Sequence, residues 1–296
     1  MLRKIITLVA LALCVIYVKR FCYKQTDGFA LSKIQSELPY NSSWEVSGSA
    51  EESQILSLLD QPFHYLAKGA QSYVFASEDG QLVIKFFRIY HLQPPRWMQV
   101  LNFPLPLQLL KLNKILAKRE ELEKDFDSYR LAYQEMKEET GLLYLHLNKT
   151  THLKKHLTLY DKLHIAHHID LDQMEFLVQK RADLVYPRID AIARSEGLEN
   201  AKSAITGLVQ LLHHRCQKGI FDKDPDLNTN FGFIDKTPVQ IDIGRFRPEE
   251  KTRSLKEEQD EIYRITDNFR QWLDVRYPEL SSHLLHEIEA LPSNDV

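Results

Sequence analysis

The sequence predicts an α+β protein of two lobes, with an antiparallel β N-terminal lobe that carries one long helix and a helical C-terminal lobe that carries a hairpin. Short apolar runs joined by turn residues occur at residues 73–87 and 231–241, and each pair predicts a β-hairpin. Apolar residues at three- and four-residue steps over residues 117–140 predict an amphipathic helix. A length of 296 residues, 44% of them hydrophobic, suits one domain divided into two lobes.

The N-terminal residues 1–22 predict a membrane anchor. Two basic residues precede an apolar run at 5–18, which only Thr7 interrupts, and two more basic residues follow it. No small-x-small cleavage site comes after the run, which favours an uncleaved signal anchor over a cleaved signal peptide or another hydrophobic element. We therefore expect a single-pass membrane protein attached through its N-terminus, with the side of the membrane left open.

The net charge and the cysteine content argue against a nucleic-acid partner and against a disulfide in the body of the chain. The net charge of −3 and the isoelectric point near 6.5 give no basic field over the whole chain, so we expect no nucleic-acid partner. Two of the three cysteines, Cys14 and Cys22, lie in or beside the anchor, and only Cys216 lies in the body. A disulfide within the body is therefore not expected.

The remaining chain divides into three predicted parts. Residues 23–59 are polar and predict a linker that ends in a short helix near residues 52–59. Residues 60–182 form the predicted N-terminal lobe, with a proline-containing insertion at 88–116, and residues 183–296 form the short helical C-terminal lobe. Within the first hairpin, Lys85 lies between two apolar residues, so its side chain points to the opposite face of the strand.

Acidic and amide residues surround the second hairpin. Asp222, Asp224 and Asn230 precede its first strand, and Asp242 follows its second strand in an Asp-Ile-Gly sequence. Carboxylate and amide oxygens are the ligands that Mg²⁺ takes from proteins, usually one or two carboxylates with substrate phosphates and water. This stretch is therefore the predicted centre of function.

The order Asp, Asn, hairpin, Asp-x-Gly resembles the catalytic loop and DFG motif of the protein-kinase-like superfamily. The resemblance implies that Asp224 is the catalytic base and that Asn230 and Asp242 bind the metal. Asn230 lies six residues after Asp224, whereas the family spacing is five. Asp222 is therefore a rival for the base, and Asn228 is a rival for the amide.

The first hairpin resembles the glycine-rich loop and β3 lysine of the same superfamily. Residues 66–74 lie over L-G-x-G-x-x-G-x-V, but only Gly69 is retained, with Ala67 and Ser72 at the other two glycine positions. The resemblance implies that Gly69 and Ser72 lie against the nucleotide phosphates and that Lys85 contacts the α- and β-phosphates.

The helix at 117–140 occupies the slot of the kinase αC helix, which supplies an acid to the β3 lysine. Asp125 and Glu121 are the candidate partners of Lys85, with Glu135 as an outsider. The apolar runs at 157–165 and 174–179 take the slots of the fourth and fifth strands. Gln179 then begins the predicted hinge at 179–182, which would bind adenine.

The resemblance implies an ATP- and Mg²⁺-dependent phosphotransferase acting on a hydroxyl acceptor: a lipid, a sugar, another small molecule or a protein. Only 52 residues follow Gly244 and no APE motif appears, so the chain resembles the compact kinase-like enzymes that phosphorylate lipids, sugars or other small molecules, or an atypical protein kinase. We expect a divergent, membrane-anchored member of the superfamily from a bacterium. One alternative is a membrane-tethered pseudokinase that binds nucleotide or protein without turnover. Another is a helical adaptor with no nucleotide site.

Overall fold

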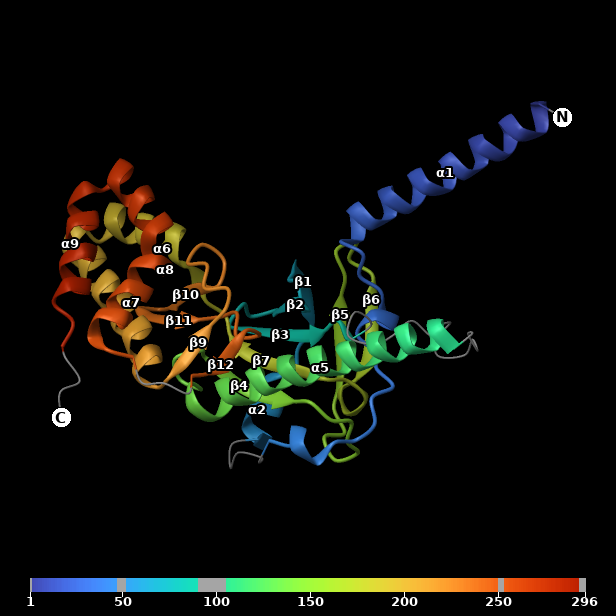
Figure 1. Cartoon of the computed structure of the whole chain (residues 1–296), viewed down its shortest axis with the longest axis horizontal. Helices are drawn as coiled ribbons and strands as arrows, with labels where there is room; N and C mark the ends of the chain where they lie inside the picture. Colours follow the sequence, from blue (N-terminus) through green and yellow to red (C-terminus); the bar gives the residue numbers. More distant parts are fainter. Residues whose placement is uncertain (1, 47–51, 90–104, 250–252, 293–296) are drawn as a thin grey trace. The chain divides into compact units, whose positions relative to one another are not determined.

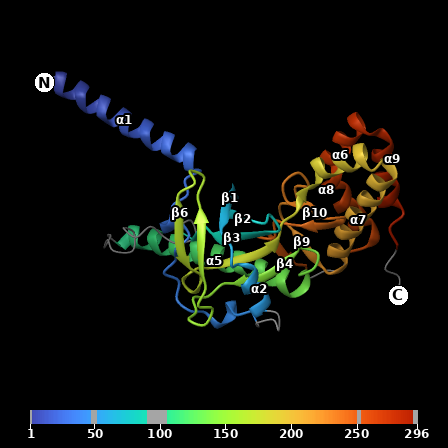
Figure 2. The same cartoon turned by 180° about the vertical axis from the view of Figure 1, so that it is seen from behind.

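The computed structural model describes residues 2–46, 52–89, 105–249 and 253–292. The chain divides into two compact units, Met1–Arg119 with His146–Leu177, and Glu120–Leu145 with Val178–Val296. The elements can be followed from both sides in Figures 1 and 2. The predicted α+β fold is confirmed: strands dominate the first part of the chain and helices the last.

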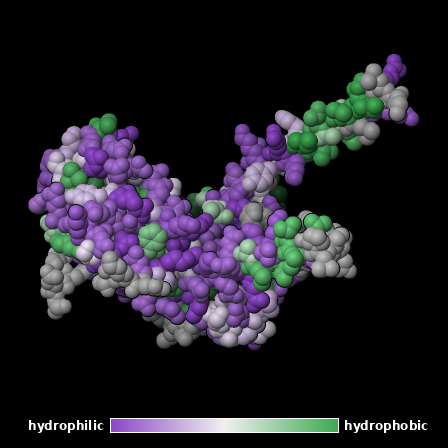
Figure 3. Space-filling model, in the orientation of Figure 1, coloured by the Kyte–Doolittle hydropathy of each residue, from purple (hydrophilic) through white to green (hydrophobic). Residues whose placement is uncertain are grey.

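Two α-helices precede the strands. Helix α1 (Leu2–Thr26) extends the predicted anchor by a full turn. Its 24-residue segment Arg3–Thr26 is long and apolar enough to span a membrane. The apolar side chains that the structure describes on this helix, such as Ile5, Leu11 and Val15, are exposed to solvent (Figure 3). Helix α2 (Glu52–Leu58) lies where the short helix was predicted. Three 3₁₀ turns complete this set: η1 (Leu31–Lys33), η2 (Ser42–Trp44) and, later in the chain, η3 (Leu171–Gln173).

Seven strands form one sheet in the order β4-β7-β3-β2-β1-β5-β6. Their bounds are β1 (Phe63–Lys68), β2 (Ser72–Ser77), β3 (Leu82–Phe87), β4 (Leu142–His146), β5 (His156–Tyr160), β6 (Ala166–Asp170) and β7 (Phe176–Lys180). The predicted first hairpin corresponds to β2 and β3, which pair antiparallel. Strand β5 adds to the free edge of β1 in a parallel pair, and β6 pairs antiparallel with β5.

The strand predicted at 157–165 is instead part of a hairpin. Strand β5 ends at Tyr160, and His164, with a positive φ of 60°, lies in the turn that leads into β6. The slot beside β7 is taken by β4, which the sequence pattern did not predict. The β5–β6 hairpin is therefore an addition to the strands that the sequence pattern predicted.

The long helix α5 (Leu105–Glu135) begins twelve residues before its predicted start and ends five residues before its predicted end. Pro106 stands at its second position, where the absent N–H of proline costs no intrahelical hydrogen bond. Leu122, Phe126 and Tyr129 are buried, as their spacing predicts. Residues 90–104 of the predicted insertion lie outside the described residues.

Helices α6 (Val185–Ser195), α7 (Leu198–Gln217), α8 (Leu255–Arg276) and α9 (Pro278–Glu289) pack around one apolar core in the second unit (Figure 1). Its fully buried members include Ile205, Phe231 and Phe269. Helix α8 begins with a capping box in which Ser254 and Glu257 exchange hydrogen bonds.

The second predicted hairpin is formed by β10 (Phe231–Ile234) and β11 (Thr237–Gln240), and β10 also pairs with β8 (Asp183–Leu184). Gly232 lies where β10 meets β8. A Cβ atom at this position would stand 2.6 Å from the Asp183 carbonyl oxygen. The two backbones approach this closely because residue 232 has no side chain.

Candidate functional site

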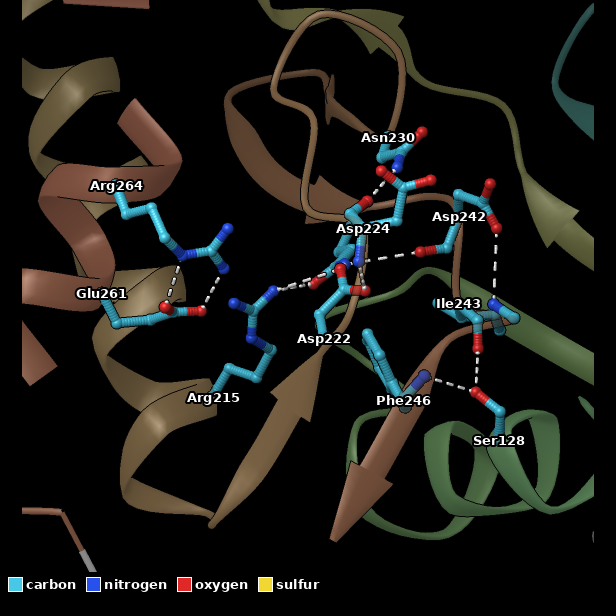
Figure 4. A network of polar contacts seen from close by, with 12 residues as sticks. Ser128, Arg215, Asp222, Asp224, Asn230, Asp242, Ile243, Phe246, Glu261 and Arg264 are labelled. Atoms are coloured by element: carbon cyan, nitrogen blue, oxygen red, sulfur yellow. Dashed lines mark hydrogen bonds and ion pairs between the residues drawn. The ribbon is translucent and has the colours of Figure 1, made fainter. Parts of the chain in front are cut away.

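A short two-stranded ladder brings the two ends of the acidic stretch together. Strand β9 (Ile220–Asp222) pairs antiparallel with β12 (Phe246–Pro248), and Asp222 lies opposite Phe246. Residues just after β9 therefore lie close to residues just before β12. These are the loop that holds Asp224 and the Asp-Ile-Gly sequence that begins at Asp242 (Figure 4).

Asp222 is buried and fully engaged. One carboxylate oxygen, Oδ1, accepts a hydrogen bond from the Asp224 backbone N–H at 3.0 Å. The other, Oδ2, accepts from Gln240 Nε2 and lies 3.6 Å from Arg215 Nη1. Burial raises the pKa of the Asp222 carboxyl above its ordinary value, although the Arg215 charge acts in the opposite sense. Asp222 is 1% exposed, and both of its carboxylate oxygens are engaged with neighbouring residues of the network.

Arg215, on α7, is the other half of this buried pair. Its guanidinium donates to Gln240 Oε1 at 2.8 Å, so Gln240 links the arginine and Asp222 from its position on β11. Arg215 is 1% exposed, and burial lowers the pKa of its guanidinium. The network therefore ties α7, β9 and β11 together with buried charge.

Asp224 differs from Asp222 in exposure. Its main chain is held at both ends: the N–H donates to Asp222, and the carbonyl oxygen accepts from Asn230 Nδ2 at 2.6 Å. Its carboxylate is exposed and makes no hydrogen bond or ion pair within the described part of the chain. A fixed backbone with an unengaged carboxylate is the arrangement expected of a base that acts on a bound substrate.

Asn230 links the loop to the hairpin. Its backbone carbonyl accepts from the N–H groups of Ile241 at 2.8 Å and Asp242 at 3.3 Å. The side-chain nitrogen is committed to the Asp224 carbonyl, which directs Oδ1 away from that carbonyl. Oδ1 accepts one hydrogen bond, from Thr229, and retains a second lone pair.

The extra residue of this loop is absorbed by a turn at Asp226. Its Oδ1 accepts from the Asn228 N–H at 3.0 Å, and its Oδ2 accepts from Thr229 Oγ1 at 2.9 Å. The Asn230 N–H then donates to the Asp226 carbonyl at 2.8 Å. This turn leaves Asn228 exposed, while Asn230 makes the contact with Asp224.

Asp242 is exposed at the end of the hairpin. Its Oδ1 accepts from the Gly244 N–H at 3.3 Å, and its Oδ2 has no hydrogen bond with any described residue. Figure 4 shows the side chains of Asp224, Asn230 and Asp242 together on the side of the network away from Arg215. Two carboxylates and an amide oxygen thus lie in one region of the second unit.

Ser128, on α5, is the residue that sequence reasoning missed. Its hydroxyl donates to the Ile243 carbonyl at 2.6 Å and accepts from the Phe246 N–H at 2.6 Å. The side chain is fully buried. A serine at three- and four-residue steps from the buried Asp125 and Ala132 was the available signal, because a polar group on a buried helix face needs a partner.

Of the acids proposed to pair with Lys85, Asp125 is buried and Glu121 is exposed, as is Glu135. Burial raises the pKa of Tyr129 far above its ordinary value, and the charges of Asp242 and Asp125 raise it further. Asp125 is therefore on the face of α5 that lies near Asp242.

Gln179, the first residue of the predicted hinge, is also buried, and its amide donates to the Thr140 carbonyl at 2.7 Å.

The remaining predicted residues belong to the first unit. Gly69 N–H donates to the Ser72 carbonyl at 2.9 Å and closes the turn between β1 and β2. Arg88 Nη1 donates to the carbonyls of Gly69 and Ala70, both at 2.9 Å. Lys85, on β3, alternates with fully buried neighbours, as the strand pattern predicts.

The donor set fits a hard cation better than a transition metal. Among the described residues, no three His, Cys, Asp or Glu side chains gather as a metal site. Asp242 and Asn230 instead offer one carboxylate and one amide oxygen. Mg²⁺ commonly accepts such a pair, since it completes its octahedral shell with phosphate oxygens and water.

The order of elements is that of the predicted α+β fold: a strand-rich part with a long helix after its third strand, then a helical part with the loop, hairpin and Asp-Ile-Gly sequence. The sequence matches no protein-family model and no curated protein.

Three solved structures are similar at a low level. A 2.2 Å crystal structure of WbdD is 15% identical over 79% of this chain and 47% of its own, with a TM-score of 0.38. A structure of the bifunctional kinase-methyltransferase WbdD is 16% identical over 79% and 48%, with a TM-score of 0.37. The Rv3197–erythromycin complex from Mycobacterium tuberculosis is 14% identical over 93% and 67%, with a TM-score of 0.32.

The chain thus spans about half the length of the WbdD chains it matches. At these TM-scores the similarities carry no argument about function.

Proposed function

We propose that the protein is an ATP- and Mg²⁺-dependent phosphotransferase that moves a phosphoryl group to a hydroxyl acceptor and is attached to a membrane by α1. One observation carries the proposal. Asn230 hydrogen-bonds to the main chain of both Asp224 and Asp242, so it holds together the two backbone positions that carry the exposed carboxylates. A purely structural Asx-rich turn would not need three carboxylate oxygens, both of Asp224 and Oδ2 of Asp242, without a partner among the described residues.

In this proposal Asp224 is the base. It would accept the proton of the acceptor hydroxyl as that oxygen attacks the terminal phosphorus. Asp222 is the weaker candidate, because its two oxygens are already occupied by Asp224, Gln240 and Arg215 and its side chain is buried.

Asp242 and Asn230 would hold Mg²⁺, which neutralises phosphate charge when bound. Ser128 would keep Asp242 in position by fixing the next carbonyl, that of Ile243. Lys85 would contact the α- and β-phosphates, and the turn at Gly69 and Ser72 would cover them. The main chain from Gln179 to residue 182 would bind adenine. Catalysis would then come mainly from positioning and charge neutralisation.

Thermal melting of the full chain in detergent, with Mg²⁺ and with or without ATP, tests the proposal. A ligand at ~100 times its Kd stabilises the folded state by ~2.7 kcal/mol, enough to raise the Tm by several degrees. We expect the wild type to show this rise and Lys85→Ala and Asp242→Ala to lose it. Asp224→Asn should keep the rise but lose phosphoryl transfer.

The control is Asp235→Asn. Asp235 is exposed in the turn of the same hairpin with a φ of 56°, a conformation that asparagine also adopts. It should match the wild type in both measurements. Absence of any ATP effect in the wild type would contradict nucleotide binding. An ATP effect without turnover on any hydroxyl acceptor would favour the membrane-tethered pseudokinase.

A further inference from the structure

The added β5–β6 hairpin lies at the end of the apolar helix α1. Lys162, in the turn between β5 and β6, donates to Asp27 Oδ2 at 2.9 Å, and Asp27 follows the last residue of α1. The same Asp27 oxygen accepts from Tyr65 at 2.9 Å. The two views in Figures 1 and 2 agree in placing the hairpin turn beside this end of the helix.

The turn carries two large apolar side chains, Leu163 and Ile165, that are exposed and do not belong to the core. Leu163 is 48% exposed and Ile165 is 53% exposed, although they are only two residues apart. Polar groups hold the turn rigid from beneath: Asp161 Oδ1 accepts from the N–H groups of both residues, at 2.8 and 3.0 Å. A rigid turn that presents two large apolar side chains is suited to insertion into an apolar medium.

Helix α1 joins the first unit without a flexible linker. The Gly28 N–H donates to the Tyr23 carbonyl at 3.1 Å, and the Gly28 carbonyl accepts from Tyr73, a buried residue of β2, at 2.8 Å. Lys68 of β1 donates to the Tyr23 hydroxyl. If α1 enters a bilayer, the folded unit therefore begins within a few residues of the bilayer surface.

The charge at this end of α1 fits an anionic surface. Four lysines, Lys24, Lys33, Lys68 and Lys162, lie at the helix end. Two acids lie beside them: Asp27, which pairs with Lys162, and the buried Asp161 of the hairpin turn, which pairs with His167. Basic side chains beside an interfacial apolar element are attracted to anionic headgroups, and lysine stems reach from an apolar region to the headgroup level.

We propose that the turn of the β5–β6 hairpin, through Leu163 and Ile165, inserts into the surface of an anionic lipid bilayer beside α1. The first unit then contacts the membrane at two points, α1 and the hairpin turn, rather than through α1 alone. This inference rests on the proposed attachment through α1, and it assigns the added hairpin a role that the phosphotransferase site does not require.

The test uses the full chain in phosphatidylcholine vesicles with and without phosphatidylglycerol. Cys14 and Cys22 are exposed and are replaced by serine, while Cys216 is buried and is left in place. A nitrobenzoxadiazole label is attached at one new cysteine in each protein: Leu163→Cys, Ile16→Cys or Val275→Cys. Quenching by doxyl lipids, with the spin label near the headgroup or deep in the acyl chain, then reports the depth of each position.

Val275 is the matched control, because its apolar side chain is 84% exposed on α8. We expect strong quenching at 16 by the deep probe, severalfold stronger quenching at 163 than at 275 by the shallow probe, and weaker quenching at 163 without phosphatidylglycerol. If the label at 163 is quenched no more than the label at 275, while the label at 16 is quenched, the inference is overturned. The proposed membrane attachment through α1 is then still supported.

Two other outcomes are decisive. Ile16 unquenched by either probe overturns the membrane attachment itself, independently of ATP binding. A label at 163 that changes with protein density in the vesicle, but not with doxyl lipid, shows contact with a second copy and overturns the inference. Thermal melting of each labelled protein confirms that the folded unit is retained.

Discussion

Ser128 Oγ donates a 2.6 Å hydrogen bond to the carbonyl oxygen of Ile243, the residue that follows Asp242. The same hydroxyl accepts from the Phe246 N–H, so one buried atom fixes two points of the segment between β11 and β12. The orientation of Asp242 is thereby set from α5, outside the hairpin that carries it.

Replacing Ser128 by alanine should therefore lower both stability and activity. Two backbone groups, the Ile243 carbonyl and the Phe246 N–H, lose the hydrogen bond to this side chain, and an unsatisfied buried group costs ~1–3 kcal/mol. We expect a loss of this size in the free energy of unfolding, measured by urea denaturation, with a weaker Tm response to ATP and Mg²⁺. Ser203→Ala, on the exposed side of α7, serves as the control and should change stability by less than ~0.5 kcal/mol. Equal stability of the two variants would contradict the role of Ser128.

Asp224→Asn should separate catalysis from folding. The exposed carboxylate has no partner to lose within the described residues, so the free energy of unfolding should change by less than ~0.5 kcal/mol. Loss of a general base typically lowers kcat by ~10²–10⁴-fold, with KM for ATP little changed. Steady-state phosphoryl transfer measures this effect once an acceptor is in hand. A variant with wild-type kcat would exclude Asp224 as the base.

Asp222→Ala should instead lower the stability of the folded state. It leaves Arg215 buried without its charge partner, and breaking a buried pair in this way costs ~3–5 kcal/mol. This loss is expected whether or not the protein is an enzyme. Urea denaturation beside Asp224→Ala tests the prediction. Comparable stability of the two alanine variants would show that the buried network does not hold the loop.

Glu175, which precedes β7, should make stability depend on pH. Its side chain is 1% exposed, Oε1 accepts from Ser36 Oγ at 2.5 Å, and burial raises the pKa of the carboxyl from 4.5 to about 7. The folded state therefore binds more protons than the unfolded state between these values, and its stability falls as the pH rises from 4.5 to about 7.

The contribution of Glu175 should be complete below pH 4.5 and lost above pH 7, with a total of ~3 kcal/mol at 1.36 kcal/mol per unit of pKa. Glu175→Gln should remove this slope. Urea denaturation at a series of pH values between 5 and 8 measures it, and an unchanged slope in the glutamine variant would assign the pH dependence to other groups.

The loop and its hairpin could be predicted because turn chemistry and apolar alternation are local signals. The β5–β6 turn could not, since residues 161–164 contain no glycine or proline and the positive φ falls on His164. Strand β4 is a short apolar run that periodicity alone does not separate from a buried helix segment. The burial of Asp222 beside the exposed Asp224 could not be predicted, because it depends on Arg215 and Gln240 from elsewhere in the chain.

The close approach of β10 and β8 at Gly232 has a consequence for any survey of substitutions. Even alanine would press against the Asp183 carbonyl and the Ala182 side chain, so the strand that follows Asn230 would have to shift. A screen scored only by turnover would rank position 232 with the acidic residues, although glycine contributes no reactive group. Pairing each activity score with a measure of soluble yield would distinguish a lost catalyst from a displaced scaffold.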